Sequence, residues 1–136
     1  MSDLVKFDEV ENKIIELRNQ KVILDSDIAA LYKVETRDIN KAVKNNPDKF
    51  PEGYTFELTK DEKAEVVENF HHLEKLKFSP QLPKAFTEKG LYMLATILKS
   101  NIATQTTLAI IETYSRIKNL STITVYQGVF LMSDWY

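Results

Sequence analysis

The chain has 136 residues and a formal net charge of −2, with 43% hydrophobic residues, 28% charged residues and no cysteine. This length suits one domain, and the mild acidity argues against a protein that coats nucleic acid without sequence preference. The lack of cysteine excludes disulfides, thiol catalysis and thiolate metal sites, and it suits a reducing compartment. We expect a cytoplasmic protein, because no apolar run is long enough for a membrane span and the N-terminus lacks the features of a signal peptide.

The first part of the chain predicts a flexible lead-in followed by a β-hairpin. Residues 1–11 are polar and mixed, and residues 13–24 contain two short apolar runs around Arg18, Asn19 and Gln20. The β-branched content of the two runs predicts strands, and Asn19 tolerates a positive φ at the turn between them. A single helix is the alternative, because some of the apolar residues also recur at a helical spacing.

Residues 24–47 predict two helices joined by a tight turn. We expect Asp25 to cap the first helix, and Thr36 to cap a second one that continues to Pro47. Lys33 occupies the turn position that favours glycine, where a left-handed backbone would cost about 1–2 kcal/mol. Three apolar residues are expected to hold the pair together: Ala29 by allowing close approach, Val34 by filling the corner, and Ile39 by anchoring the second helix.

The second helix of this pair predicts a DNA-reading surface. Ile39, Ala42 and Val43 form its apolar side, and the opposite side is cationic. This is the pattern of a helix-turn-helix, in which Arg and Lys meet guanine or phosphate and Asn reads adenine. The predicted DNA-binding residues are Lys33, Thr36, Arg37, Asn40, Lys41, Lys44 and Asn45, with Lys49 as a further phosphate contact.

Two observations limit this prediction. Residues 33–49 contain five basic and three acidic side chains, so their net charge is only +2, and the segregation of charge on the helix is the stronger signal. The alternative is a pair of antiparallel core helices whose basic side is merely solvated, because basic helical faces are common.

The rest of the chain predicts a strand over residues 54–58 and then helices. Thr59 and Glu62 form a capping box that starts a helix ending near Asn69. Residues 71–78 are ambiguous, with Leu76 and Phe78 suited to a short strand, and residues 79–83 form a loop with two prolines. Thr87 is expected to cap the next helix, and Ser100 or Asn101 the last one, which runs to about residue 120 with a wide apolar face.

Residues 121–136 are apolar and β-prone. A tail of this composition packs on the domain, pairs with a second chain or aggregates, so a homo-oligomer formed through Ser121 to Tyr136 is one expectation. The fold class that we predict is α+β, with a small N-terminal β-hairpin, short strands, a helix-turn-helix-like pair and two C-terminal helices. The predicted divisions are residues 1–11, 12–120 and 121–136.

No catalytic or metal chemistry is expected. His71 and His72 are adjacent, so their side chains diverge and are unsuited to sharing one ion, and a solvated loop is the favoured interpretation. The acidic residues of the helix after Thr59 are expected to form a solvated face. The three glycines form no phosphate-binding loop or nucleophile elbow, so we expect neither an enzyme nor a cofactor.

Two long motifs, over residues 21–62 and 82–120, resemble the KilA-N-type DNA-binding domain of phage antirepressors, in the subgroup related to the baculovirus Bro N-terminal domain. The resemblance covers roughly residues 12–120. It implies a compact α+β domain from a phage or prophage, in a bacterial host cell, that binds double-stranded DNA through the helix pair. It transfers the DNA-contacting role to Arg37, Lys41 and Lys44.

The chain departs from the family at three places. Two turn glycines that are usual in the family are Asn19 and Lys33 here, and residues 121–136 do not resemble the coiled region into which members continue. A truncated end or a nonfunctional prophage remnant is therefore one alternative. Another is a protein-interaction module that sequesters a phage repressor, which the acidic net charge favours.

Overall fold

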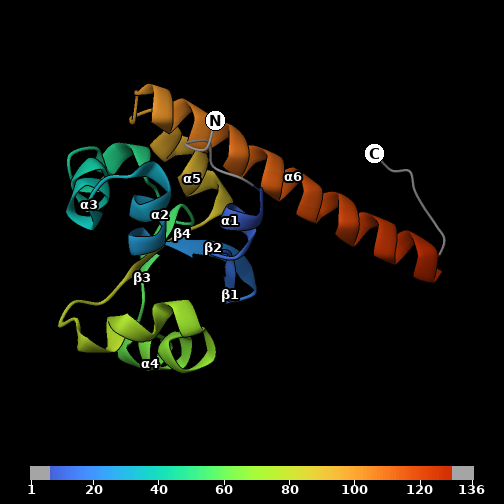
Figure 1. Ribbon diagram of the computed structural model, residues 1–136, viewed down its shortest axis with the longest axis horizontal. Helices are drawn as coiled ribbons and strands as arrows, with labels where there is room; N and C mark the ends of the chain where they lie inside the picture. The colour runs from blue at the N-terminus through green and yellow to red at the C-terminus, as the bar shows by residue number, and fades with distance from the viewer. Residues whose placement is uncertain (1–6, 130–136) are drawn as a thin grey trace.

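The computed structural model describes residues 7–129, and the side chains of residues 7–119. It is an α+β structure, as predicted, in which a small antiparallel sheet lies between two groups of helices (Figure 1). The elements in chain order are α1 (Phe7–Glu11), β1 (Ile15–Leu17), β2 (Gln20–Leu24), α2 (Asp25–Tyr32), α3 (Thr36–Lys44), the 3-10 helix η1 (Pro47–Lys49), β3 (Thr55–Glu57), α4 (Lys60–Asn69), the 3-10 helix η2 (His71–Phe78), β4 (Lys84–Phe86), α5 (Glu88–Ala95) and α6 (Asn101–Val129).

The sheet has the strand order β1-β2-β4-β3, and every pairing is antiparallel. The predicted hairpin is confirmed: Ile15 pairs with Val22, and Arg18 and Asn19 form the two-residue turn with φ of 54° and 62°. Positive φ at both central residues matches the twist of the flanking strands. Strand β4, which the sequence did not predict, joins the hairpin to β3 and so completes the sheet.

The second part of strand β2, from Val22 to Leu24, is buried on both faces, which gives the protein two apolar cores. Ile23 belongs to the core that α2, α3, α5 and α6 share, whereas Val22 and Leu24 belong to the core under α4 and η2. Successive residues of a strand point to opposite faces, so one short strand serves both cores. Figure 1 shows the same division, with α4 below the sheet and α2, α5 and α6 above it.

The helix-turn-helix-like pair forms as expected in outline, with several local differences. Ala29 and Ile39 are buried, as predicted, but Val34 is 39% exposed and fills no corner. Leu24, not Asp25, is the N-cap of α2, and Glu35, not Thr36, is the N-cap of α3. Asp25 and Thr36 are instead the first helical residues, and α3 ends at Lys44 rather than at Pro47.

Helix α6 fastens α2 in place. The hydroxyl of Thr106 donates to the carbonyl of Leu31 at 3.2 Å, and the hydroxyls of Tyr32 and Thr107 lie 2.8 Å apart in a hydrogen bond. Thr106 is fully buried at this contact. Because Ile39 in turn buries α3 against the same core, the orientation of α3 depends on α6 through α2.

Lys33 adopts a left-handed backbone conformation, with φ of 59° and ψ of 43°. This is the conformation whose steric cost was expected at this turn position. We therefore expect Lys33→Gly to raise the free energy of unfolding by about 1 kcal/mol, since glycine relieves the steric cost but loses more chain entropy on folding. Lys41→Gly, at an exposed helical position, is the matched control and should lower it by a similar amount. Urea unfolding of both variants measures the two values, and a destabilised Lys33→Gly variant would contradict the strain argument.

The C-terminal half confirms the predicted caps and corrects two other predictions. Thr59, Thr87 and Ser100 each accept a backbone N–H at the start of α4, α5 and α6. Residues 71–78 form a 3-10 helix, not a strand. The face of α6 is narrower than expected, because Leu108 and Ile111 are 57% and 41% exposed.

The C-terminal tail was predicted to be β-prone from residue 121, but the helical backbone of α6 continues to Val129. The side chains of residues 120–136 and the backbone of residues 130–136 lie outside the part that the structure describes, as does most of the predicted lead-in over residues 1–11. Within the described residues, no helix is long and apolar enough to cross a membrane.

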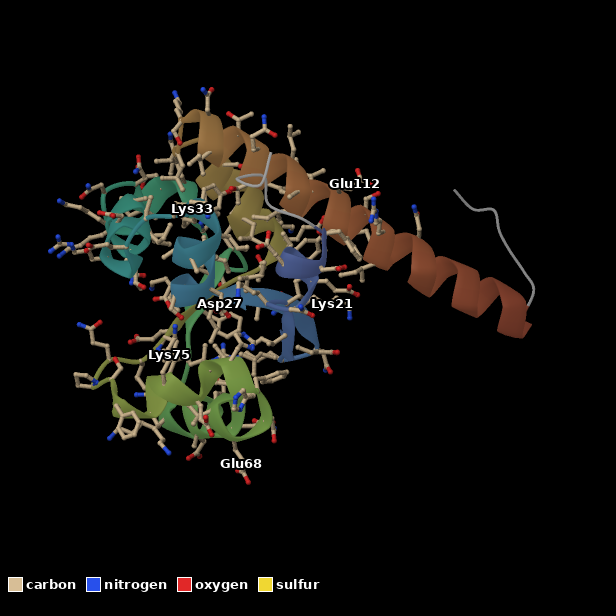
Figure 2. All side chains as sticks on the ribbon, viewed as in Figure 1. Lys21, Asp27, Lys33, Glu68, Lys75 and Glu112 are labelled. Atoms are coloured by element: carbon tan, nitrogen blue, oxygen red, sulfur yellow. The ribbon has the colours of Figure 1, made fainter. Side chains whose placement is uncertain are left out.

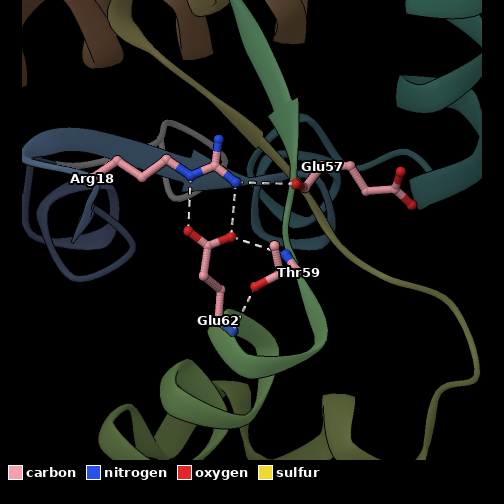
Figure 3. A network of polar contacts seen from close by, with 4 residues as sticks. All are labelled: Arg18, Glu57, Thr59 and Glu62. Atoms are coloured by element: carbon pink, nitrogen blue, oxygen red, sulfur yellow. Dashed lines mark hydrogen bonds and ion pairs between the residues drawn. The ribbon is translucent and has the colours of Figure 1, made fainter.

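A bidentate ion pair ties the hairpin to α4 (Figure 3). The Arg18 guanidinium donates from Nε and Nη2 to the two carboxylate oxygens of Glu62 at 2.8 and 2.9 Å, and it lies 3.9 Å from the ring centre of Phe56. Glu62 also accepts the backbone N–H of Thr59 at 2.9 Å. Glu62 was expected on a solvated face, but here it fixes the start of α4 to the turn of the hairpin.

The hydrogen bond from Arg18 lowers the pKa of Glu62 from 4.5 to about 2. A depressed folded-state pKa stabilises the fold above the unfolded-state value and loses this contribution as the pH falls towards 2. We therefore expect Glu62→Gln to destabilise the protein at pH 6, and the difference from the wild type to shrink between pH 5 and pH 2. Urea unfolding curves of both proteins across this pH range measure the difference in stability. Glu68→Gln, at an exposed position of the same helix, is the control and should show no such pH dependence.

Candidate nucleic-acid interface

Helix α3 presents a cationic surface to solvent. Arg37, Lys41 and Lys44 are exposed, while Ile39 on the opposite side is fully buried. Lys33 precedes the helix and Lys49 follows it, and both are exposed; Figure 2 labels Lys33 beside the upper group of helices. Five cations at and around α3 can therefore reach an anionic partner without unfolding any part of the core.

Two acidic groups at the start of α3 reduce this positive charge. Glu35 forms an ion pair with Arg37 at 3.0 Å, with side chains that are 70% and 84% exposed. The Glu35 N–H donates to the Asp38 carboxylate at 3.0 Å, which caps the helix. Ion pairs this exposed contribute little free energy, so a phosphate competes readily with Glu35 for the guanidinium of Arg37.

Asn40 was predicted to share the exposed face with Arg37, Lys41 and Lys44, but it is half-buried. Its amide nitrogen donates to the Asp25 carboxylate at 3.0 Å, and its amide oxygen is buried without a hydrogen-bond partner. Asp25 is only 5% exposed, and burial raises the pKa of its carboxyl, while the hydrogen bond from Asn40 opposes this shift. Asn40 therefore fixes α3 to the first turn of α2.

The two other polar residues of the predicted set lie at the ends of α3. Thr36 is half-buried in the first turn, and Asn45 is exposed at the C-cap, where its N–H donates to the carbonyl of Lys41 at 2.8 Å. The structure thus brings the cations of the predicted set to one surface, with Thr36 and Asn45 at its two ends. The side chain of Asn40 is instead directed inward, to the Asp25 carboxylate.

A cavity of about 470 Å³ lies between α3 and the segment before β4. Its lining includes Asn40 and Asp25 from the helix pair, Lys84 from β4, and residues 80–82. The segment over residues 80–82 is therefore a neighbour of the cationic helix. A larger cavity of about 1020 Å³ lies elsewhere, between the hairpin, the start of α5 and α6, and none of the predicted DNA-binding residues lines it.

A hydrogen bond between His72 and Asp27 joins the lower group of helices to the upper one. His72 Nε2 lies 3.0 Å from Asp27 Oδ2, so η2 is bonded to the first turn of α2. Burial raises the pKa of Asp27, and the contact with His72 opposes this shift. The prediction of a solvated loop was wrong for His72, because residues 45 positions apart meet here. Among the described residues, no group of three or more potential ligands is placed to hold a metal ion.

Comparison with known proteins gives one match. The model of the ORF6N domain matches residues 12–97, which include the hairpin, the helix pair, the sheet and α5. No curated protein and no solved structure is found to match the chain. The matched span covers more than half of the chain and contains the whole candidate interface. The chain therefore belongs to the ORF6N domain family, a phage-associated family related to the Bro-N and KilA-N-like antirepressors.

Proposed function

We propose that the chain is a KilA-N-type DNA-binding domain of an antirepressor-like phage or prophage regulator, acting in the bacterial cytoplasm. In this proposal α3 enters the major groove of double-stranded DNA. Phosphate contacts come from Lys33, Arg37, Lys41, Lys44 and Lys49, and Thr36 and Asn45 contribute polar contacts. Asn40 acts by holding α3 in place through Asp25.

The observation that carries the proposal is the placement of charge on α3. Its exposed cations lie opposite the fully buried Ile39, so the helix is fastened to the core by one side and free on the other. The three-residue turn from Lys33 to Glu35 is the length found in helix-turn-helix motifs. The relation of the family to phage antirepressors agrees with this use of the helix pair.

The test begins with selection of a binding site from a random duplex library, using the whole chain. The affinity for the enriched duplex is then measured as a function of salt concentration. Phosphate contacts from Lys33, Arg37, Lys41 and Lys44 should give a slope of log K against log salt near −3.6, and the fifth contact from Lys49 steepens it to about −4.5. No enriched sequence, or binding that is insensitive to salt, would contradict the proposal.

The ion pair between Glu35 and Arg37 gives a more specific prediction. Glu35→Gln removes an acid beside the proposed phosphate contacts and frees the guanidinium, so affinity for the selected duplex should rise by about two- to fivefold. Titration of a labelled duplex measures it. Glu112→Gln is the matched control, because Glu112 is an exposed acid paired with Arg116 at 3.4 Å on α6. Equal effects of the two substitutions would argue against a DNA surface at the start of α3.

A second candidate function is that of a protein-interaction module that binds and sequesters a phage repressor. It is favoured by the exposed apolar side chains Leu108 and Ile111 on α6. Pull-down from a lysogenic host after complete nuclease digestion separates the two candidates. Retention of one repressor by the wild type, and its loss in a Leu108→Ser plus Ile111→Ser variant, would support this alternative.

A further inference from the structure

Phe78 is the most exposed large apolar side chain of the described residues, at 80%. It ends η2 and is followed by a segment whose shape is fixed: Lys63 of α4 donates to the carbonyls of Ser79 and Gln81, and prolines occupy positions 80 and 83. A single exposed apolar side chain is common on protein surfaces, so any role for this ring depends on the charged groups and elements around it.

Two lysines and one acid lie within four positions of Phe78 in the sequence. Lys75 and Lys77 are exposed, and the Lys77 ammonium lies 5.1 Å from the centre of the Phe78 ring. Glu74 is the one acid in residues 71–84, and His71 lies 3.7 Å from its carboxylate. Helix α4 and η2 form the lower group of helices. Figure 2 shows Lys75 on the side of this group that faces α2 and α3, whereas Glu68 lies on the opposite side.

The segment after Phe78 is a neighbour of α3. Residues 80–82 and Asn40 of α3 line the same cavity of about 470 Å³, and Phe78 precedes residue 80 by only two positions, or about 7 Å of extended chain. In Figure 1, α3 and the segment between η2 and β4 both reach the left-hand side of the molecule. A duplex bound by α3 would therefore extend past Phe78.

We propose that Phe78, flanked by Lys75 and Lys77, is a second contact with the same duplex, in the minor groove beside the site that α3 reads. The ring packs against a base step, as apolar wedges of minor-groove proteins do, and the two lysines meet the flanking phosphates. This inference rests on the proposed function, because it needs a duplex held by α3.

The test compares three duplexes: the selected duplex with long flanks, and two versions of it that are each shortened on one side by about 5 base pairs, or half a helical turn. Phe78→Ala should weaken binding to the long duplex by about tenfold and have no effect on one of the shortened duplexes. Phe78→Tyr keeps the ring and should bind as the wild type does. Lys77→Ala should flatten the salt slope by about 0.9.

Leu108→Ala is the matched control, since Leu108 is the next most exposed apolar side chain and lies on α6; it should leave binding unchanged. Wild-type affinity in Phe78→Ala, with weakened binding in an Arg37→Ala plus Lys41→Ala variant, would overturn this inference alone and point to a protein partner for Phe78. Failure of the wild type to bind any selected duplex would overturn the proposed function, and this inference with it.

Discussion

Replacing Gly90 by alanine is expected to lower the free energy of unfolding by about 3 kcal/mol. Gly90 is buried in α5, and a Cβ there would lie 2.1 Å from the carbonyl oxygen of Tyr54. That oxygen already accepts hydrogen bonds from the N–H and the hydroxyl of Thr87, both at 3.1 Å. Since the obstacle is backbone and not a flexible side chain, α5 must move away and the cap made by Thr87 must open.

Chemical unfolding of Gly90→Ala measures this loss. Lys89→Ala, at the exposed neighbouring position of the same helix, is the control and should change the stability by less than about 0.5 kcal/mol. A Gly90→Ala variant as stable as the wild type would mean that α5 does not approach the chain at Tyr54 as closely as described here.

The second large effect concerns DNA binding. Arg37→Ala combined with Lys41→Ala should lower the affinity for the selected duplex roughly 60-fold at 0.1 M salt, because two phosphate contacts are lost. The slope of log K against log salt should flatten by about 1.8 for the same reason. Both side chains are exposed and neither belongs to the apolar core, so the variant should remain folded.

Lys60→Ala combined with Lys89→Ala removes two exposed positive charges from α4 and α5 and serves as the control. It changes the net charge by the same amount as the first variant. If the two double variants weaken binding equally, the interaction depends on overall charge and not on a surface at α3.

Features that depend on neighbouring residues could be predicted from the sequence. The hairpin follows from two β-branched runs around Asn19, and the capping box of Thr59 and Glu62 lies within one helical turn. The left-handed backbone at Lys33 was foreseen for the same reason, because the turn between the helices is only three residues long.

Features that depend on contacts between residues far apart in the chain could not be predicted from the sequence. Strand β4 is three residues long and follows a proline, so it shows no alternating pattern, and its partners Ile23 and Phe56 are remote in sequence. Helical spacing places Asn40 with the cations of α3. Its burial depends on Asp25, which the sequence suggested as a cap and the structure places inside the first turn of α2.

In the candidate interface too, local features could be predicted from the sequence and features that depend on distant contacts could not. The spacing of the three α3 cations predicted their common exposure, which the structure confirms. The sequence of residues 71–78 is ambiguous, with Leu76 and Phe78 suited to a short strand, so it does not predict that the ring of Phe78 is exposed at the end of a 3-10 helix.

The placement of α3 on DNA can be measured directly, because the chain has no cysteine and a single introduced thiol can carry a photoreactive group. The labelled Lys41→Cys chain should crosslink to bases within the selected site on illumination, and an excess of the unlabelled duplex should abolish the crosslink. The labelled Lys60→Cys chain should give little product, since Lys60 lies on α4. No crosslink from Lys41→Cys, or equal yields from the two positions, would contradict the assignment of α3 as the helix that reads DNA.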